Sequence, residues 1–200
     1  MTDNISKPRQ ALVSRNTSET KIALSLNLGG SEIEISTGIG FMDHMLNLFA
    51  HHGGFGLTVN AVGDTHIDDH HTVEDLGIAL GRAFDDAAGD KNEIVRYGQM
   101  LLPMDEALVE AAVDFGGRGF LHLDLPFRSA KTGTFDLQLV EEFFRALAVN
   151  AKITLHINLR YGKNDHHIAE AAFKAVARAL KQAVQVYSGH IPSTKGIIDG

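Results

Sequence analysis

The 200-residue chain contains no cysteine, and several classes of protein are excluded by what else it lacks. Without cysteine there is neither a disulfide framework nor a thiolate zinc site. The net charge of −7 at pH 7 argues against a general nucleic-acid-binding protein, which would present a basic surface. No apolar stretch approaches the ~18 residues of a membrane span, and residues 1–10 lack the apolar core of a signal peptide. We therefore expect a cytoplasmic protein with no membrane or nucleic-acid partner.

Histidine, by contrast, is abundant. The chain has 11 histidines, and six of them form adjacent pairs at positions 51–52, 70–71 and 166–167. They do not form the terminal run that marks a purification tag. A hydrophobic content of 44% is enough to fill the core of one compact domain or of two small fused halves.

Two of these pairs belong to a motif that occurs twice. The segment DHHTVE at 69–74 recurs as DHHIAE at 165–170, and the spacing is 96 residues (166 minus 70). Each copy opens a run with helical periodicity. Residues three and four apart on a helix share a face, so Glu74 can converge with His70 or with His71.

The chemistry of the repeated motif points to metal. Imidazole and carboxylate are ligands that borderline divalent metals choose. Adjacent histidines point about 100° apart around a helix, so one pair tends to serve two metals, or one metal and one partner. Two copies of the motif in a chain without cysteine make a metalloenzyme the leading hypothesis.

The similarity between the two parts of the chain extends beyond this motif. Residues 19–30 align with 106–117, and both are predicted strands that end in a Gly-Gly turn. A strand, a helix, a strand and a long helix follow in each half. Their predicted ranges are 32–36, 41–51, 56–62 and about 71–88, and then 119–125, 135–149, 152–161 and about 166–187.

We therefore predict an α+β fold that is internally duplicated. Each half is expected to be a β-sheet covered on one face by two helices, and the two halves can pack face to face. The boundary is predicted near residues 90–103, which gives half-repeats 1–95 and 96–200 that together form one catalytic domain.

Four single residues, in two pairs of matching positions, are candidates for a functional role because of the repeat. His44 interrupts an apolar helical run, and the matching position in the second half is close to Glu142. A lone histidine in a helix usually has a structural role, but here we favour a metal ligand. Glu19 and its repeat mate Glu106 are predicted to lie in strands, where carboxylates are usually solvated. The repeated position favours an acid–base role.

The candidates for binding an anion lie elsewhere in the chain. Arg118 stands between two glycines, where the backbone can approach a ligand, and the hydroxyl and ammonium groups of residues 193–195 suit a phosphate. Arg96 is a further candidate. The glycine-rich segments fit neither a dinucleotide fingerprint nor a P-loop.

Four segments together resemble a known family. They are GIGFMDHML at 38–46, DTHIDDHHTVED at 64–75, GKNDHHIAE at 162–170 and PSTKG at 192–196. On these motifs the chain resembles the imidazoleglycerol-phosphate dehydratases of histidine biosynthesis, in their monofunctional form. The resemblance implies a ribosomal protein S5 domain 2-like fold, two Mn²⁺ ions per active site, active sites shared between subunits, and a hollow homo-oligomer of 24 subunits.

The resemblance also implies roles for individual residues. The implied metal ligands are His44, His70, His71, Glu74, His166, His167 and Glu170. The family has a further histidine ligand where this chain has Glu142, and because carboxylate is acceptable to Mn²⁺ we expect replacement of that ligand, not its loss. Glu19 would contact the substrate as the acid–base group, and His44, His71 and Glu170 would share in catalysis. The substrate phosphate would be held by Arg96, Arg118, Ser193, Thr194 and Lys195.

The implied reaction explains why two metals are needed. Water leaves the glycerol chain of imidazole glycerol phosphate, and the product is imidazole acetol phosphate. No carbonyl stands beside the breaking C–H bond, so the imidazole ring must store the electrons. With a metal on each ring nitrogen the ring can become an imidazolate and then a diazafulvene-like intermediate, and the metals act as Lewis acids and as a template.

Two other functions share these residues. A two-metal hydrolase would hold its ions roughly 3.5–4 Å apart around a bridging water, closer than an imidazole bridge allows. A metal-storage or structural-metal protein would show closed coordination with no opening for a substrate. The hydroxyl- and lysine-containing segment at 193–195 and the two arginines argue against storage.

Overall fold

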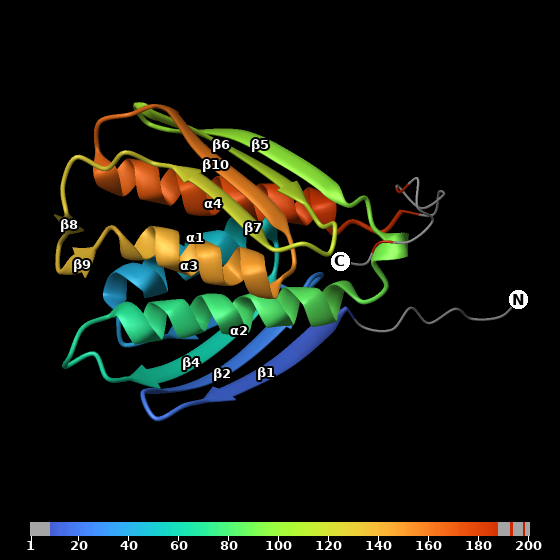
Figure 1. The fold of residues 1–200 in the computed structure, drawn as a ribbon, viewed down its shortest axis with the longest axis horizontal. Helices are drawn as coiled ribbons and strands as arrows, with labels where there is room; N and C mark the ends of the chain where they lie inside the picture. The colour runs from blue at the N-terminus through green and yellow to red at the C-terminus, as the bar shows by residue number, and fades with distance from the viewer. Residues whose placement is uncertain (1–8, 188–192, 194–197, 199–200) are drawn as a thin grey trace, which may run out of the picture.

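The computed structural model describes residues 9–187, 193 and 198, and its described part is built from four α-helices and two four-stranded sheets (Figure 1). The first half contains β1 (Gln10–Asn16), β2 (Thr20–Asn27), β3 (Ile33–Ser36), α1 (Gly40–Gly53), β4 (Gly56–Gly63) and α2 (His70–Ala88). After a short 3₁₀ helix η1 (Lys91–Glu93), the second half contains β5 (Tyr97–Met104), β6 (Ala107–Asp114), β7 (Phe120–Asp124), β8 (Lys131–Thr132), β9 (Phe135–Asp136), α3 (Leu139–Asn150), β10 (Thr154–Tyr161) and α4 (Asp165–Ala183).

The two sheets have the same topology. Their strand orders are β1-β2-β4-β3 and β5-β6-β10-β7, so each strand of the first sheet has a counterpart in the second. In both sheets the second strand of this order runs antiparallel to the first and to the third, and the last strand runs parallel to the third. The predicted α+β fold with two similar halves is therefore confirmed.

The helices lie between the two sheets (Figure 1). One face of each sheet is apolar because buried and exposed residues alternate along the strands, as in β2, where Ile22, Leu24 and Leu26 are buried. α1 and α2 cover the first sheet, α3 and α4 cover the second, and the halves meet where α2 packs on α3 and α1 on α4. The halves thus pack face to face through their helices.

Glycine lets α2 and α3 approach closely. A Cβ atom on Gly77 would lie 2.5 Å from the carbonyl oxygen of Phe143, and one on Gly81 would lie 2.7 Å from that of Leu147. Both distances are too short for a carbon atom, so only glycine fits at these two positions of α2.

Several secondary-structure elements differ from their predicted ranges. The expected boundary segment 90–103 contains most of β5, an edge strand that tolerates Pro103 because one side of it needs no hydrogen-bond partner. α3 begins at Leu139 instead of residue 135, and the β8–β9 hairpin precedes it. Glu19 and Glu106 lie in the turns of hairpins β1–β2 and β5–β6, and not in strands.

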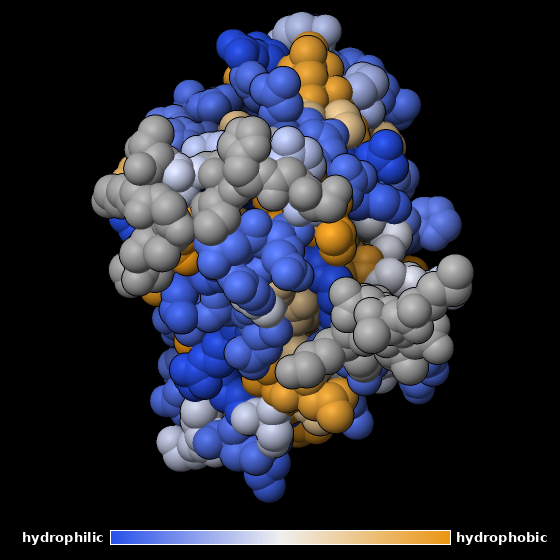
Figure 2. Space-filling view, turned by 90° about the vertical axis from the view of Figure 1, so that its right-hand side faces the viewer, coloured by the Kyte–Doolittle hydropathy of each residue, from blue (hydrophilic) through white to orange (hydrophobic). Residues whose placement is uncertain are grey.

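The N-terminal ends of α2 and α4 lie at one end of the molecule, and their C-terminal ends lie at the other (Figure 1). The end that carries the helix C-termini is mostly hydrophilic, with apolar patches between the polar groups (Figure 2). Within the described residues, no helix is long and apolar enough to span a membrane.

Candidate metal centre

The two His-His motif pairs lie in the first turns of α2 and α4, where a side chain shortly before each helix accepts hydrogen bonds from their amides. Oδ1 of Asn164 accepts hydrogen bonds from the amides of His166 (3.0 Å) and His167 (3.4 Å). Oδ1 of Asp68 accepts one from the amide of His70 (2.8 Å). In each pair the two rings are nearly perpendicular, with interplanar angles of 89° and 88°. The two histidines of a pair therefore face different surroundings.

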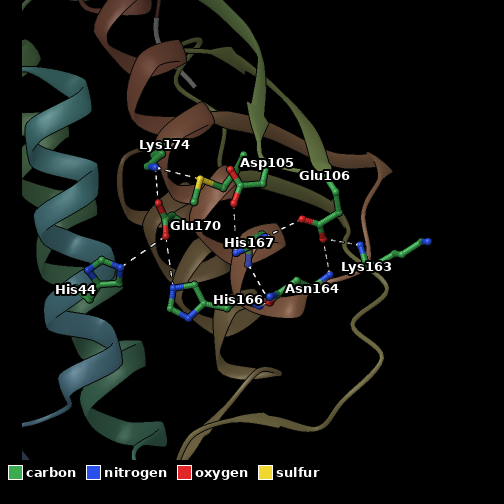
Figure 3. A network of polar contacts seen from close by, with 10 residues as sticks. His44, Asp105, Glu106, Lys163, Asn164, His166, His167, Glu170 and Lys174 are labelled. Carbon is green, nitrogen blue, oxygen red and sulfur yellow. Dashed lines mark hydrogen bonds and ion pairs between the residues drawn. The ribbon is translucent and has the colours of Figure 1, made fainter.

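Three donor atoms converge between α1 and α4. Nε2 of His44 lies 3.6 Å from Oε2 of Glu170, and Nε2 of His166 lies 3.4 Å from the same oxygen (Figure 3). One ligand atom from each of the three residues lies within 4.8 Å of the others. Two ligands that each lie ~2.1 Å from one ion, at right or tetrahedral angles, are roughly 3.0–3.4 Å apart. This α1–α4 cluster therefore has the donor atoms and nearly the spacing of a divalent-metal site.

The carboxylate of the α1–α4 cluster is buried and held in its charged form. Glu170 is 7% exposed, and Lys174, one helical turn further along α4, donates a hydrogen bond to Oε1. Burial raises the pKa of Glu170, but the hydrogen bond and positive charge of Lys174, with His44 and His166, outweigh it, so the pKa is lowered. Oε1 thus faces Lys174, and Oε2 faces the histidines. Sequence reasoning missed Lys174, although its i,i+4 spacing from Glu170 was a signal.

His71 and His167 each bind a carboxylate through Nδ1. The distances are 3.0 Å from His71 to Oδ2 of Asp64 and 2.7 Å from His167 to Oε2 of Glu106. These hydrogen bonds raise the pKa of both histidines. A carboxylate on one ring nitrogen orients the imidazole and leaves the other nitrogen for a metal. Sequence reasoning missed the role of Asp64 beside His71.

The repeat mates Glu19 and Glu106 differ in their surroundings. Glu106 accepts hydrogen bonds from the amides of Lys163 (3.1 Å) and Asn164 (2.7 Å) as well as from His167. The hydrogen bond with His167, followed by that from Asn164, lowers the pKa of Glu106 to about 2. The Glu19 carboxylate is 49% exposed and lies 3.9 Å from Nε2 of His71. Glu19 is therefore the more accessible of the two carboxylates.

A second set of predicted ligands faces the α2–α3 contact. Glu74 of α2 and Glu142 of α3 are half-buried, and His70 lines a cavity of about 360 Å³ together with Gln138 and Leu139 from the start of α3. Glu142 lies 3.9 Å from Nε of Arg145. Over the residues with described positions, these side chains do not meet the three-ligand spacing of the α1–α4 cluster.

A second cavity, of about 410 Å³, is lined by His44 and His166, and the β8–β9 hairpin separates it from the first. Asp69 and Thr134 line both cavities. Phe135 of the hairpin stacks on Phe41 at 4.7 Å between ring centroids, and Phe41 in turn meets the ring of His166 edge-on at 5.5 Å. The hairpin therefore supports the histidine side of the site.

Arg96, one of the two arginines expected to bind phosphate, lies at the end of the molecule opposite the α1–α4 cluster. The amide of Arg96 donates to the carbonyl of Ala183, the last residue of α4, whereas His166 lies in the first turn of that helix. The 17 residues between them (183 minus 166) span about 26 Å of helix. Arg96 and the α1–α4 cluster of one chain are therefore too far apart to bind the same small molecule.

The structure describes some of the predicted anion ligands, Arg96 among them, but not all of them. The guanidinium of Arg96 donates to both carboxylate oxygens of Asp114 at 2.7 and 3.1 Å, and this pairing raises its pKa. Arg118 is exposed, and Ser193 is described. Thr194 and Lys195 lie outside the described residues.

Comparison with known proteins identifies the family. Residues 37–180 match the imidazoleglycerol-phosphate dehydratase (IGPD) family. The imidazoleglycerol-phosphate dehydratases of Desulforamulus reducens and Streptococcus mutans are 58% and 54% identical to this chain; the alignments cover 95% of this chain and 98% and 100% of theirs. The chain belongs to the imidazoleglycerol-phosphate dehydratase family.

Solved structures of the IGPD family have the same fold as this chain. The imidazoleglycerol-phosphate dehydratase of Staphylococcus aureus is similar with a TM-score of 0.82 and 43% identity, over 89% of this chain and 99% of that one. The IGPD of Pyrococcus furiosus is similar with a TM-score of 0.83 and 36% identity, over 92% and 99%. As a member of the IGPD family, the chain is an enzyme of the hydro-lyase class, and the resemblance seen in its motifs is confirmed.

Proposed function

We propose that this chain dehydrates imidazole glycerol phosphate to imidazole acetol phosphate in the biosynthesis of histidine. The observation that carries the proposal is the convergence of His44, His166 and Glu170, which come from two helices and both halves of an IGPD-family chain. We also propose that half-repeats 1–95 and 96–200 form one catalytic domain, and that the protein acts in the cytoplasm.

The proposed cofactor is Mn²⁺, two ions per active site. The donor set fits a divalent metal because it offers imidazole nitrogens and carboxylate oxygens, and the chain has no thiolate. The α1–α4 cluster would hold one ion, and His70, Glu74 and Glu142 would serve the second. His71 and His167 already bind carboxylates of their own chain through Nδ1, so we assign their Nε2 atoms to sites completed by neighbouring subunits.

Each group then has a role in the reaction. Divalent ions held by these ligands would supply Lewis acidity to the imidazole ring of the substrate, so that the ring could take up the electrons of the breaking bonds. We assign the proton transfer to Glu19, and its half-exposed carboxylate, 3.9 Å from Nε2 of His71, supports this assignment. The network of Lys174 and the histidines keeps Glu170 charged.

The phosphate of the substrate requires a second subunit. Arg96 lies about 26 Å from His166 along α4, much further than this small molecule can reach. We therefore assign Arg96, Arg118, Ser193, Thr194 and Lys195 to the phosphate of a substrate whose imidazole is bound by another copy of the chain. This division supports a large homo-oligomer, with 24 subunits as the proposed number.

The geometry does not favour a two-metal hydrolase. The two sets of proposed ligands belong to different helix pairs, α1 with α4 and α2 with α3, and no carboxylate of one set is shared with the other. A hydrolytic pair of ions lies roughly 3.5–4 Å apart, which favours ligands close enough to serve both ions. The metal separation in a Mn²⁺-loaded crystal would discriminate between the two reactions.

The test is a product assay. The Mn²⁺-loaded protein is incubated with imidazole glycerol phosphate, and we expect imidazole acetol phosphate to form only when metal is present. If fully loaded protein made no acetol product, the proposed function would be wrong.

A further inference from the structure

A buried ionic network lies beneath Glu19. Asp75 of α2 is 5% exposed; its Oδ1 lies 2.6 Å from the guanidinium of Arg15 in β1, and its Oδ2 accepts a 2.5 Å hydrogen bond from the hydroxyl of Thr20 in β2. The network therefore ties α2, one residue after the proposed ligand Glu74, to both strands of the hairpin that carries Glu19.

The network continues into the turn itself. The hydroxyl of Thr17 accepts hydrogen bonds from the amides of Glu19 (3.1 Å) and Thr20 (2.9 Å), and it lies 3.2 Å from the hydroxyl of Thr20. A continuous chain of polar contacts thus leads from the buried carboxylate of Asp75 to the backbone of Glu19.

The second half of the chain lacks this network. In the alignment that pairs Glu19 with Glu106, Arg15 corresponds to Leu102 and Thr20 to Ala107; in the motif alignment Asp75 corresponds to Ala171. The structure supports the match, because Arg15 pairs with Ile22 across β1–β2 as Leu102 pairs with Val109 across β5–β6.

The two halves therefore allow the same fold to be compared with and without the polar network. With leucine and two alanines the second half still has the same sheet order, a hairpin at the same place and a His-His-x-x-Glu helix start. A buried charge is costly to remove from water, and apolar residues of similar size often stabilise as well or better. The fold alone thus does not require the three polar residues, and the half that has them is the half with the more accessible carboxylate, Glu19.

We propose that Asp75, Arg15 and Thr20 are positioning residues, which set the Glu19 turn for proton transfer beside His71. This inference rests on the proposed acid–base role of Glu19. Proton transfer demands a fixed distance and angle. The Glu106 carboxylate is already held by two amides and His167, so the turn that carries Glu19 has the greater need of support from the network.

The test installs the residues of the second half in the first. Removing one partner would leave a buried charge unpaired, so all three are changed together, as Arg15→Leu, Thr20→Ala and Asp75→Ala. We expect the triple variant to fold and bind Mn²⁺ as the wild type does. Its kcat should fall roughly 10- to 100-fold, since small misplacements of a catalytic group have effects of this order, and KM should stay within about twofold.

A second experiment tests whether the loss of kcat in the triple variant acts through Glu19. In a Glu19→Gln background the triple change should lower kcat by less than about twofold more, because the group that it positions is already gone. An equal fall in both backgrounds, or a wild-type kcat in the triple variant, would overturn the proposal. Failure of the premise shows separately, as an unchanged kcat in Glu19→Gln alone.

Hydrogen exchange gives a readout independent of turnover. The amides of Glu19 and Thr20, which donate to Thr17, should exchange faster in the triple variant, while the corresponding turn at 104–107 stays unchanged as an internal control. Wild-type protection at residues 17–20 would contradict the inference.

A control variant separates positioning from stability. Leu24→Ala, which truncates a buried side chain further along β2, should lower stability but leave kcat at the wild-type value. A matching loss of kcat in Leu24→Ala would show that the effect of the triple variant is one of stability alone.

Discussion

At the scale of single residues, the site uses the same residue types for different purposes. Glu19 and Glu106 occupy equivalent hairpin turns, but only Glu106 accepts two backbone hydrogen bonds together with one from a histidine. A carboxylate with a pKa of about 2 is a weak base, and it is better suited to holding His167 in place.

Substitution by glutamine should separate these two roles. We expect Glu19→Gln to lower kcat by ~10²–10⁴-fold with metal content unchanged, because a positioned acid–base group contributes this much. The matched Glu106→Gln variant should instead weaken metal affinity by about 10–100-fold, as loss of the partner of a metal-bound histidine does. Steady-state kinetics and metal titration measure both effects, and the opposite pattern would reverse the assignments.

Histidine substitutions test the ligand assignment. We expect His70→Ala and His167→Ala each to abolish turnover and to lower the bound Mn²⁺, with the fold intact, since these residues lie at helix starts outside the core. His122→Ala is the control, because His122 lies on the outer face of β7 and contacts Asn158 instead of the site. Elemental analysis gives the metal content. Full occupancy of both metals in His70→Ala or His167→Ala would be incompatible with the assignment.

At the scale of elements, much of the fold could be predicted from the sequence, because periodicity reports which face of each element is buried. β10 alternates cleanly and α2 and α4 are long, so their ranges were predicted within a few residues. β5 was missed because Pro103 and adjacent leucines break its alternation, and the two-residue strands β8 and β9 have no periodicity to detect.

The metal centre could be predicted only in part from the sequence, because periodicity does not report which side chains meet. The spacing of His-His-x-x-Glu indicates that ligands converge, but not which histidine of a pair faces which partner. That choice depends on Asp64, in the loop that follows β4, on Glu106, which is 61 residues from His167, and on Asn164 at the start of α4. The turns that carry Glu19 and Glu106 were taken for strands because each borders a strongly alternating segment.

The α2–α3 contact offers a prediction at this scale. A methyl group on Gly77 would lie 2.5 Å from a carbonyl oxygen of α3, so Gly77→Ala must push the two helices apart. We expect it to lower the free energy of unfolding by about 1–3 kcal/mol, as overpacking does, and to weaken metal binding between α2 and α3. Gly40→Ala at the start of α1 meets no atom within 4 Å and should be nearly neutral. Denaturant unfolding compares the two, and equal stability would disprove the close contact.

At the scale of the whole molecule, one ionic contact joins the two halves at the end opposite the metal cluster. Asp85 of α2 pairs with Lys91 at 2.5 Å and with Lys152, in the turn between α3 and β10, at 2.8 Å. Burial raises the pKa of Asp85, but the hydrogen bonds from Lys152 and Lys91 outweigh it and the pKa is lowered. Stability from a lowered pKa is present above the unfolded value and is lost as the pH falls through the folded one.

Asp85→Asn should therefore destabilise the protein at pH 7, by about 1 kcal/mol because Lys152 is partly exposed and solvent screens the pair. The difference from the wild type should shrink as the pH falls below about 4. Asp86→Asn is the control, since Asp86 is exposed, and it should change little. Urea unfolding at several pH values measures this. A difference that grew toward low pH would contradict the sign of the shift.

We propose that two subunits complete one active site, since His166 and Arg96 lie at opposite ends of α4. Chelation should dissociate the assembly into smaller inactive species, which light scattering detects, and Mn²⁺ should restore it. We would dissociate two inactive variants, His166→Ala and Arg96→Ala, mix them and add Mn²⁺. A site with both intact ends arises in at most about one quarter of random pairings, so we expect up to that fraction of wild-type activity. Mixed particles that contained both variants and stayed inactive would contradict the shared site.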